Sequence, residues 1–110
     1  MSGRITNYRQ FWPYYLREHA RAGTRKIHYL GTSLVLLCAL VTVASGKWAL
    51  LILLPLAGYG PAWVAHFFVE RNRPATFRYP LWSLVSDFRM FFTWLSGGLP
   101  RELGKAGIIP

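Results

Sequence analysis

The stretch IHYLGTSLVLLCALVTVAS, residues 27–45, decides the fold of this 110-residue chain. Its 19 residues would extend about 28 Å as an α-helix, roughly the thickness of one hydrocarbon core. A second apolar stretch, WALLILLPLAGYGPAWVAHFFV, follows at residues 48–69 and would extend about 33 Å. Only Gly46 and Lys47 separate the two, so the sequence predicts two membrane spans joined as a tight helical hairpin.

The second stretch contains residues that interrupt a regular helix. Pro55 lies inside it, and Gly58, Gly60 and Pro61 follow. Because proline lacks the backbone N–H of a regular helix, we expect a kink or break in this region. Pro61 would equally suit the first turn of a separate half-helix that carries the end of the stretch.

The residues before the first span predict a short helix. Residues 5–22 fit a leading segment and then a helix with Pro13 in its first turn. We expect Gly23 to end this helix and Thr24 to act as the N-cap of the first span. A long aromatic segment precedes that span, so we interpret it as a retained span and not as a signal peptide.

A third helix is predicted after the polar connection at residues 70–78. Pro80 opens it, and residues 81–95 continue it with a narrow stripe of Ser83, Ser86, Asp87 and Met90. The charges of Asp87 and Arg89 are unusual in a simple span, so this helix is expected to be either embedded or interfacial. Residues 97–110 contain several glycines and prolines and are expected to form a loosely held tail.

Composition and charge agree with a membrane protein. The chain is 53% hydrophobic, and its formal charge is +9 from 13 Lys and Arg against four Asp and Glu. A nucleic-acid-binding function is disfavoured, because the mean hydropathy of +0.23 is high for a soluble basic protein. The single cysteine, Cys38, excludes an intrachain disulfide and is expected to serve in packing. The sequence therefore predicts one all-α membrane domain over residues 1–110, with its core at about residues 8–95.

The basic residues predict the orientation in the membrane. Lys47 is the only cation in the hairpin loop, whereas many cations flank the outer ends of the spans. Those before the first span are Arg4, Arg9, Arg17, Arg21, Arg25 and Lys26, and those after the second are Arg71, Arg73 and Arg78. The positive-inside rule therefore places both outer ends in the cytoplasm.

This topology brings the three histidines of the chain to one depth. His28 begins the first span, and His66 ends the second together with Glu70, which is four residues later and on the same helix face. His19 lies nine residues before His28, and a chain reversal at Gly23 would let it approach. Three imidazoles and a carboxylate are a plausible site for iron or zinc.

The residues alone leave a second interpretation equally open. A histidine at a membrane interface often serves as an amphipathic anchor, and Glu70 could form an ion pair with Arg71 or Arg73. Asp87 would orient a histidine ring in a metal site, or would only make a polar contact between helices. Tyr15 would line such a site, or would belong to the belt of aromatic residues at the membrane interface. The cations near the site would hold an anionic head group or only set the topology. No phosphate-binding loop, metalloprotease motif or nucleophile elbow is present.

Two segments of the chain resemble the fungal 2-hydroxy fatty acid dioxygenase family and its short bacterial relatives. They are YLREHARAGTRKIHYLG, residues 15–31, and AHFFVERNRPA, residues 65–75, within a similarity that covers about residues 8–95. The stretch GYGPAWVAHFFVERNRPATFRYPLWSLVSDFRMF, residues 58–91, is similar to the bacterial branch. Thr24 stands where the family usually has Asn. Both residues can cap the helix before His28, so the substitution preserves a capping role but argues against a catalytic or ligand role at this position.

The resemblance implies an Fe(2+)-dependent enzyme that converts a 2-hydroxy fatty acid and O2 into a fatty acid one carbon shorter, with loss of CO2. It implies that His19, His28 and His66 are catalytic metal ligands and that Glu70 is the family's acid. The residues expected to contact the substrate are Arg25, Arg73 and Tyr15. Those expected to support the ligands are Thr24 and Asp87.

We expect an integral protein of a bacterial inner membrane, and the orientation given by the basic residues puts its N-terminus and metal site on the cytoplasmic side. Two spans and one helix leave a thin wall around such a site, which makes a homodimer a candidate assembly. The competing functions are a non-catalytic membrane protein that binds a lipid, a metal or a partner helix, and a zinc hydrolase-like site.

Overall fold

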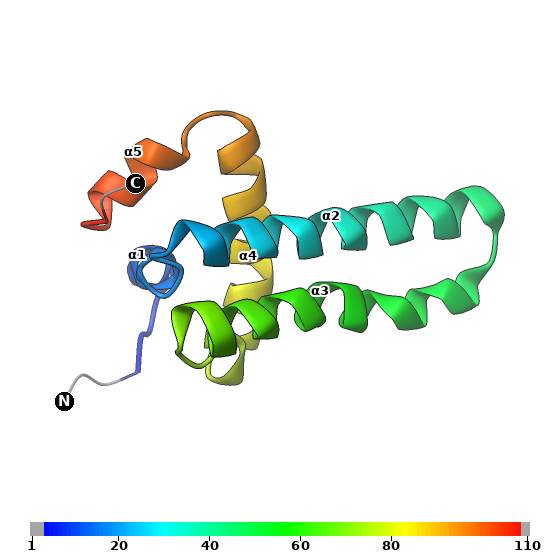
Figure 1. Cartoon of the computed structure of the whole chain (residues 1–110), viewed down its shortest axis with the longest axis horizontal. Coiled ribbons are helices and arrows are strands. Elements are labelled where there is room, and N and C mark those ends of the chain that lie inside the picture. Colours follow the sequence, from blue (N-terminus) through cyan, green and yellow to red (C-terminus); the bar gives the residue numbers. More distant parts are fainter. Residues whose placement is uncertain (1–3, 109–110) are drawn as a thin grey trace.

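Two long helices dominate the computed structural model, which describes residues 4–108, and no strand occurs among those residues (Figure 1). The all-helical class predicted from the sequence is therefore confirmed. The elements in chain order are α1 (Tyr8–Arg17), α2 (Ala22–Ser45), η1 (Trp48–Ile52), α3 (Leu53–Val64), η2 (Ala65–Glu70), η3 (Ala75–Phe77), α4 (Pro80–Leu95) and α5 (Leu99–Lys105).

The α2–α3 hairpin has the tight connection that the sequence predicts. Gly46 ends α2 in the left-handed conformation, with φ of 70°, and its N–H bonds to the carbonyl of Thr42 at 2.9 Å. Two helical segments, Ala22–Ser45 and Trp48–Glu70, are long and apolar enough to cross a membrane. Only 28% and 11% of their apolar stretches are buried, unlike the core helices of a soluble protein. Such a large exposed apolar surface suits contact with lipid.

Small residues let the two arms of the hairpin approach closely. A Cβ added at Gly31 would lie 3.2 Å from the Ala57 carbonyl oxygen, and one at Gly58 would lie 3.2 Å from Val35 Cγ2. Close approach of this kind is typical of helix pairs in membranes. Cys38 lies in the same contact, where its thiol is 3.4 Å from the Leu50 carbonyl oxygen, in line with a packing role.

The second arm changes its helix type at both ends. It begins as the 3-10 helix η1, continues as α3 and finishes as the π-helix η2. Pro55 lies in the first turn of α3, and the helix continues through Pro61. The kink or break expected between Pro55 and Pro61 is therefore not at that place. The departures from α-helical geometry lie at the two ends of the arm, in η1 and η2. π-Helical turns often occur at functional sites, and His66 lies in this one.

Three sequence expectations for the N-terminal region are wrong. Helix α1 begins at Tyr8, because the Asn7 side chain accepts the Gln10 N–H at 2.9 Å, and Pro13 therefore lies inside the helix. Gly23 and Thr24 lie in the first turn of α2, whose N-cap is Arg21. The chain turns between α1 and α2 in residues 18–21 instead.

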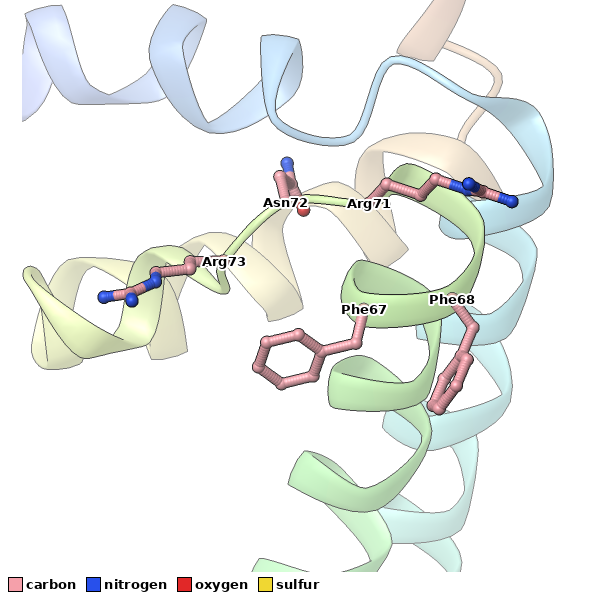
Figure 2. Close-up of a pocket in the computed structure, with 5 residues that line it drawn as sticks. All are labelled: Phe67, Phe68, Arg71, Asn72 and Arg73. Carbon is pink, nitrogen blue, oxygen red and sulfur yellow. The ribbon is translucent and has the colours of Figure 1, made fainter.

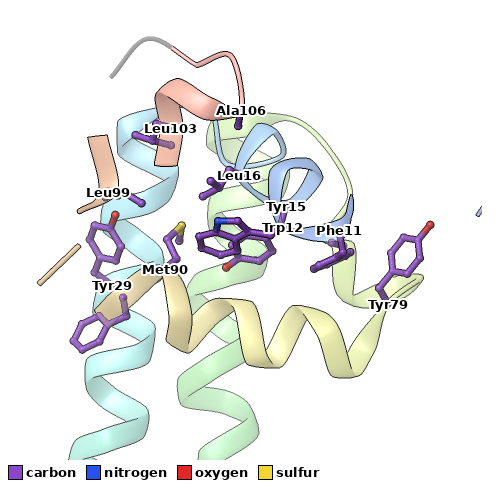
Figure 3. Close-up of a cluster of buried hydrophobic side chains, with 12 residues drawn as sticks. Phe11, Trp12, Tyr15, Leu16, Tyr29, Tyr79, Met90, Leu99, Leu103 and Ala106 are labelled. Carbon is purple, nitrogen blue, oxygen red and sulfur yellow. The ribbon is translucent and has the colours of Figure 1, made fainter. Parts of the chain in front are cut away.

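The hydrophobic core lies at one end of the hairpin, where α1 and α5 pack near α4 (Figure 3). Phe11, Trp12, Tyr15 and Leu16 of α1 are buried in it, together with Met90 of α4. Helix α4 begins at Pro80 as predicted and buries Ser83, Ser86 and Met90 of the expected stripe. It runs across the two long helices and not along them (Figure 1).

The C-terminal segment differs from the loosely held tail that the sequence suggested. Residues 99–105 form α5, and Leu99, Leu103 and Ala106 are buried in the core. The indole N–H of Trp12 donates to Glu102 Oε1 at 2.9 Å. Spaced apolar side chains therefore hold this segment against α1, although Gly97 and Pro100 suggested a turn-rich tail.

Candidate metal centre

Three histidine side chains meet in the interior, next to the aromatic core. The Nε2 atoms of His19 and His28 are 3.1 Å apart, those of His28 and His66 are 3.1 Å apart, and those of His66 and His19 are 2.9 Å apart. The three residues are only 1%, 5% and 2% exposed. They form a group that is close enough to hold one metal ion.

Each histidine comes from a different part of the fold. His19 lies in the connection that reverses the chain between α1 and α2, His28 lies in the second turn of α2, and His66 lies in η2. The hairpin brings His28 and His66 to the same end of its two arms. The connection after α1 then lays His19 against both, so the meeting predicted from the sequence occurs.

The outer nitrogen of each ring faces an oxygen atom. The Nδ1 of His19 is 2.6 Å from the Tyr15 carbonyl oxygen, and the Nδ1 of His66 is 2.7 Å from Asn72 Oδ1. The Nδ1 of His28 is 3.6 Å from Asp87 Oδ1, which is the same arrangement at a longer distance. Oxygen partners of this kind fix the ring orientation in metal sites and place the proton on Nδ1.

The consequence is that three lone pairs point at one another. If Nδ1 carries the proton in each ring, each Nε2 is an acceptor, and the short Nε2–Nε2 distances cannot be ordinary hydrogen bonds. Burial and the neighbouring rings His28 and His66 hold the pKa of His19 well below its usual value, so this ring is neutral. A cation between the three nitrogens would relieve the repulsion of the lone pairs.

The donor set fits a mononuclear transition-metal ion. Neutral imidazole suits iron and zinc, with metal–nitrogen distances of about 2.0–2.1 Å. The three Nε2 atoms, 2.9–3.1 Å apart, are close enough for all three rings to contact one such ion.

Asp87 connects the metal centre to the aromatic core. The Tyr15 hydroxyl donates to Asp87 Oδ1, and the same oxygen faces His28 Nδ1. Burial raises the pKa of Asp87 to about 7, and the hydrogen bond from Tyr15 partly offsets this rise. Burial and the nearby Asp87 raise the pKa of Tyr15 well above its usual value, so its hydroxyl stays a proton donor. Both residues therefore lie beside the histidines, where Tyr15 holds Asp87 and Asp87 faces the ring of His28.

The structure does not bring Glu70 to the three rings. Its Oε1 accepts the Arg21 backbone N–H at 3.0 Å and the Thr24 hydroxyl at 2.7 Å. The carboxylate therefore neutralises donors at the N-terminus of α2, where the helix dipole favours negative charge. Thr24 does not cap α2 with its own side chain, and its hydroxyl instead ties the start of α2 to the end of η2.

The two arginines expected at the substrate have different surroundings. Arg25 is 6% exposed, and its Nη1 donates to the carbonyl oxygens of His19 and Ala20 at 2.8 and 2.9 Å. It therefore holds the reversing connection that positions His19. Arg73 is exposed and lines, with Arg71, Phe67 and Phe68, an open cavity of about 450 Å³. The side chains of Arg71 and Arg73 point in opposite directions (Figure 2).

Asn72 is the residue that the sequence reasoning missed. Its Oδ1 faces the Nδ1 of His66, and its Nδ2 donates to the Glu18 carbonyl at 3.0 Å. The preceding Arg71 has a positive φ of 61°, and the Asn72 N–H bonds back to the His66 carbonyl at 2.9 Å. The sequence did contain one sign of this role, because Asn72 follows His66 by six residues and lies just past the end of an apolar span, close enough to contact the ring.

An apolar helical hairpin that ends in a buried group of three histidines defines a candidate membrane metalloprotein. A family model described as 2-hydroxy-palmitic acid dioxygenase Mpo1-like matches residues 5–99, a range that includes every residue of the centre. The chain belongs to this Mpo1-like family, which confirms the resemblance seen in the sequence. No curated protein and no solved structure matches the chain.

Proposed function

We propose that this protein is an iron(II)-dependent dioxygenase of fatty acid α-oxidation. The reaction consumes a 2-hydroxy fatty acid and O2 and yields the fatty acid one carbon shorter, CO2 and water, which balances all atoms. Family membership supports the reaction class. The observation that carries the proposal is the meeting of three Nε2 atoms at 2.9–3.1 Å, each on a ring whose Nδ1 faces an oxygen.

In this proposal His19, His28 and His66 hold the ion. Bound iron(II) supplies the redox chemistry by which dioxygen can react with the substrate. The Tyr15 carbonyl, Asn72 and Asp87 hold the rings in orientation, and burial of all three rings excludes bulk water from the centre. Glu70 is left out of the ligand set, because its carboxylate is occupied by Arg21 and Thr24.

The membrane arrangement follows from the position of the centre at one end of the hairpin. We place this end at the cytoplasmic face of a bacterial inner membrane, because Arg71, Arg73 and Arg78 cluster there. Helix α4 crosses the hairpin at the same end and would lie in the interface and not form a third span (Figure 1). The carboxylate end of a fatty acid can then reach the metal while its tail stays among apolar side chains.

The test is metal analysis together with oxygen uptake on 2-hydroxypalmitate by the purified protein. The wild type should bind about one iron per chain, consume O2 and form pentadecanoate. His66→Ala should lose both iron and turnover, whereas Phe67→Ala, a change at the next and half-exposed side chain, should keep both.

Three results would contradict the proposal. Iron binding without oxygen uptake across 2-hydroxy acids would favour a non-catalytic binding protein. Turnover without oxygen would favour a zinc hydrolase-like site. Turnover by metal-free protein would exclude the histidine centre as the catalyst.

A further inference from the structure

An apolar cavity of about 350 Å³ lies between α2, α3 and α4. Thr32 and Val35 of α2, Leu54 and Gly58 of α3, and Leu84 of α4 are among its lining residues. Its volume falls within the range of small-molecule sites, which are mostly apolar with a few polar groups at defined points. The charged or titratable groups in its wall, within the described residues, are Tyr59 and the pair His28 and Asp87.

That pair joins the cavity to the metal centre. His28 and Asp87 also line a second, much smaller cavity of about 10 Å³, whose wall includes His19 and His66. This smaller space has room for about one water molecule or ion. One side of His28 and Asp87 therefore faces the small space beside His19 and His66, and the other faces an apolar space of ligand size.

Ser83 is an unexplained polar group in the wall of the smaller cavity. It is 2% exposed, and its Oγ has no hydrogen-bond partner among residues 4–108. A buried hydroxyl without a partner costs free energy, so its presence calls for a ligand or a water molecule. Ser86, one turn further along α4, is also buried but shares a hydrogen bond of 2.8 Å with the Tyr8 hydroxyl.

We propose that the apolar cavity binds the hydrocarbon tail of the 2-hydroxy fatty acid and that Ser83 Oγ hydrogen-bonds to its polar end beside the metal. This inference rests on the proposed function and deepens it by locating the substrate. The occupant has to be apolar along most of its length and polar at one end. Apart from Thr32 and Tyr59, the wall of the cavity along α2 and α3 is apolar. His28 and Asp87 lie at its metal end, and Ser83 lines the smaller cavity on the other side of that pair.

The cavity also gives the tail a direction. Val35 lies seven residues after His28, which is about 10 Å further along α2. Leu54 lies near the start of α3 and so marks the end of the cavity away from His66. A bulky side chain at Leu54 should therefore limit the length of tail that the cavity accepts.

The tail site is tested with a 2-hydroxy fatty acid that carries a photoreactive diazirine at its terminal carbon. Irradiation of the purified protein in lipid nanodiscs should label the segment around Leu54 to Tyr59, and excess 2-hydroxypalmitate should suppress the label. Leu54→Trp should shift preferred binding to acids shorter by several carbons. Leu53→Trp, an exposed neighbour that does not line the cavity, is the matched control and should leave the preference unchanged.

Labelling that excess 2-hydroxypalmitate does not suppress, or an unchanged length preference in Leu54→Trp, would overturn the tail site. These readouts do not need turnover, so the two proposals fail separately. Suppressible labelling without oxygen uptake retains the tail site and contradicts the proposed reaction. Oxygen uptake without suppressible labelling retains the reaction and overturns the tail site.

The role of Ser83 is tested by comparing the binding of 2-hydroxypalmitate with that of palmitate. Ser83→Ala should reduce the preference for the hydroxylated acid by about 3- to 10-fold, the value of one neutral hydrogen bond. Ser86→Ala removes an equally buried hydroxyl that already has a partner, and it should lower thermal stability without changing this preference. An unchanged affinity for both acids in Ser83→Ala would show that Ser83 contacts neither the hydroxyl nor the carboxylate of the polar end.

Discussion

The side chain of Asn72 accepts from His66 Nδ1 at 2.7 Å and also donates to the Glu18 carbonyl at 3.0 Å. One amide thus joins the segment η2, which carries His66, to the connection that carries His19. Replacement by Ala removes the acceptor and should lower metal affinity by about 10- to 100-fold. Titration in metal buffers checks this, with the exposed neighbour Arg73→Ala as control. Equal affinities in the two variants would contradict a positioning role.

Glu70 should be dispensable for metal binding. Glu70→Gln weakens the contacts to Arg21 N–H and the Thr24 hydroxyl, so it should lower stability by about 1 kcal/mol through loss of charge-assisted hydrogen bonds. The number of iron ions per chain should stay the same, as measured by elemental analysis. Loss of iron at normal helical content would restore Glu70 to the ligand set.

Acid should destabilise the metal-free protein through His19. Burial lowers the pKa of His19, so below about pH 6.5 the unfolded chain binds a proton that the folded chain excludes. The contribution of His19 to stability should therefore fall as the pH drops from 6.5, by at most about 1.4 kcal/mol per pH unit. Asp87, whose pKa is raised to about 7, contributes with the opposite sign over this range, so the comparison with a His19 variant isolates the histidine. Thermal unfolding between pH 5 and 7 checks the slope, which should be smaller in His19→Gln. Identical slopes in both proteins would contradict the assignment.

Helix α5 should contribute to the stability of the core. Leu103 is 2% exposed, so Leu103→Ala should cost about 2–5 kcal/mol, the usual range for a buried leucine. Leu95→Ala removes the same atoms from a 59% exposed position and is the matched control. The midpoint of thermal unfolding in detergent distinguishes them. Equal midpoints would mean that the segment after Gly97 is held as loosely as its composition suggests.

The packing of Gly31 should govern both the hairpin and the metal centre. A methyl group at Gly31 would lie 3.2 Å from a backbone oxygen of α3, one turn beyond His28, and backbone has little freedom to move. Gly31→Ala should therefore separate the arms and lower iron occupancy and thermal stability together. At Gly60 the nearest atom to such a methyl is 3.8 Å away, so Gly60→Ala should be tolerated. A normal iron content in Gly31→Ala would contradict the coupling.

The sequence by itself predicts the main elements and the meeting of the three histidines. The apolar stretches at residues 27–45 and 48–69 are long enough to be recognised as helices, and Pro80 marks the start of α4. Because spans place their ends at defined depths, topology alone brings His28 and His66 together. These features depend on local composition and on the length of the chain between elements, which can be read without knowing any partner.

The tertiary structure alone decides which polar groups surround the three histidines. Glu70 shares a helix face with His66 by spacing, yet it bonds to Arg21 and Thr24, while Asn72 takes the place beside the ring. Arg25 is buried because its guanidinium donates to the His19 and Ala20 carbonyls. Helix α5 packs against the core through its buried apolar side chains. These contacts join residues that lie far apart in the sequence or across a chain reversal. A hydrogen bond forms only when the donor and acceptor atoms are placed to within a few tenths of an ångström, and helical periodicity cannot specify positions that closely.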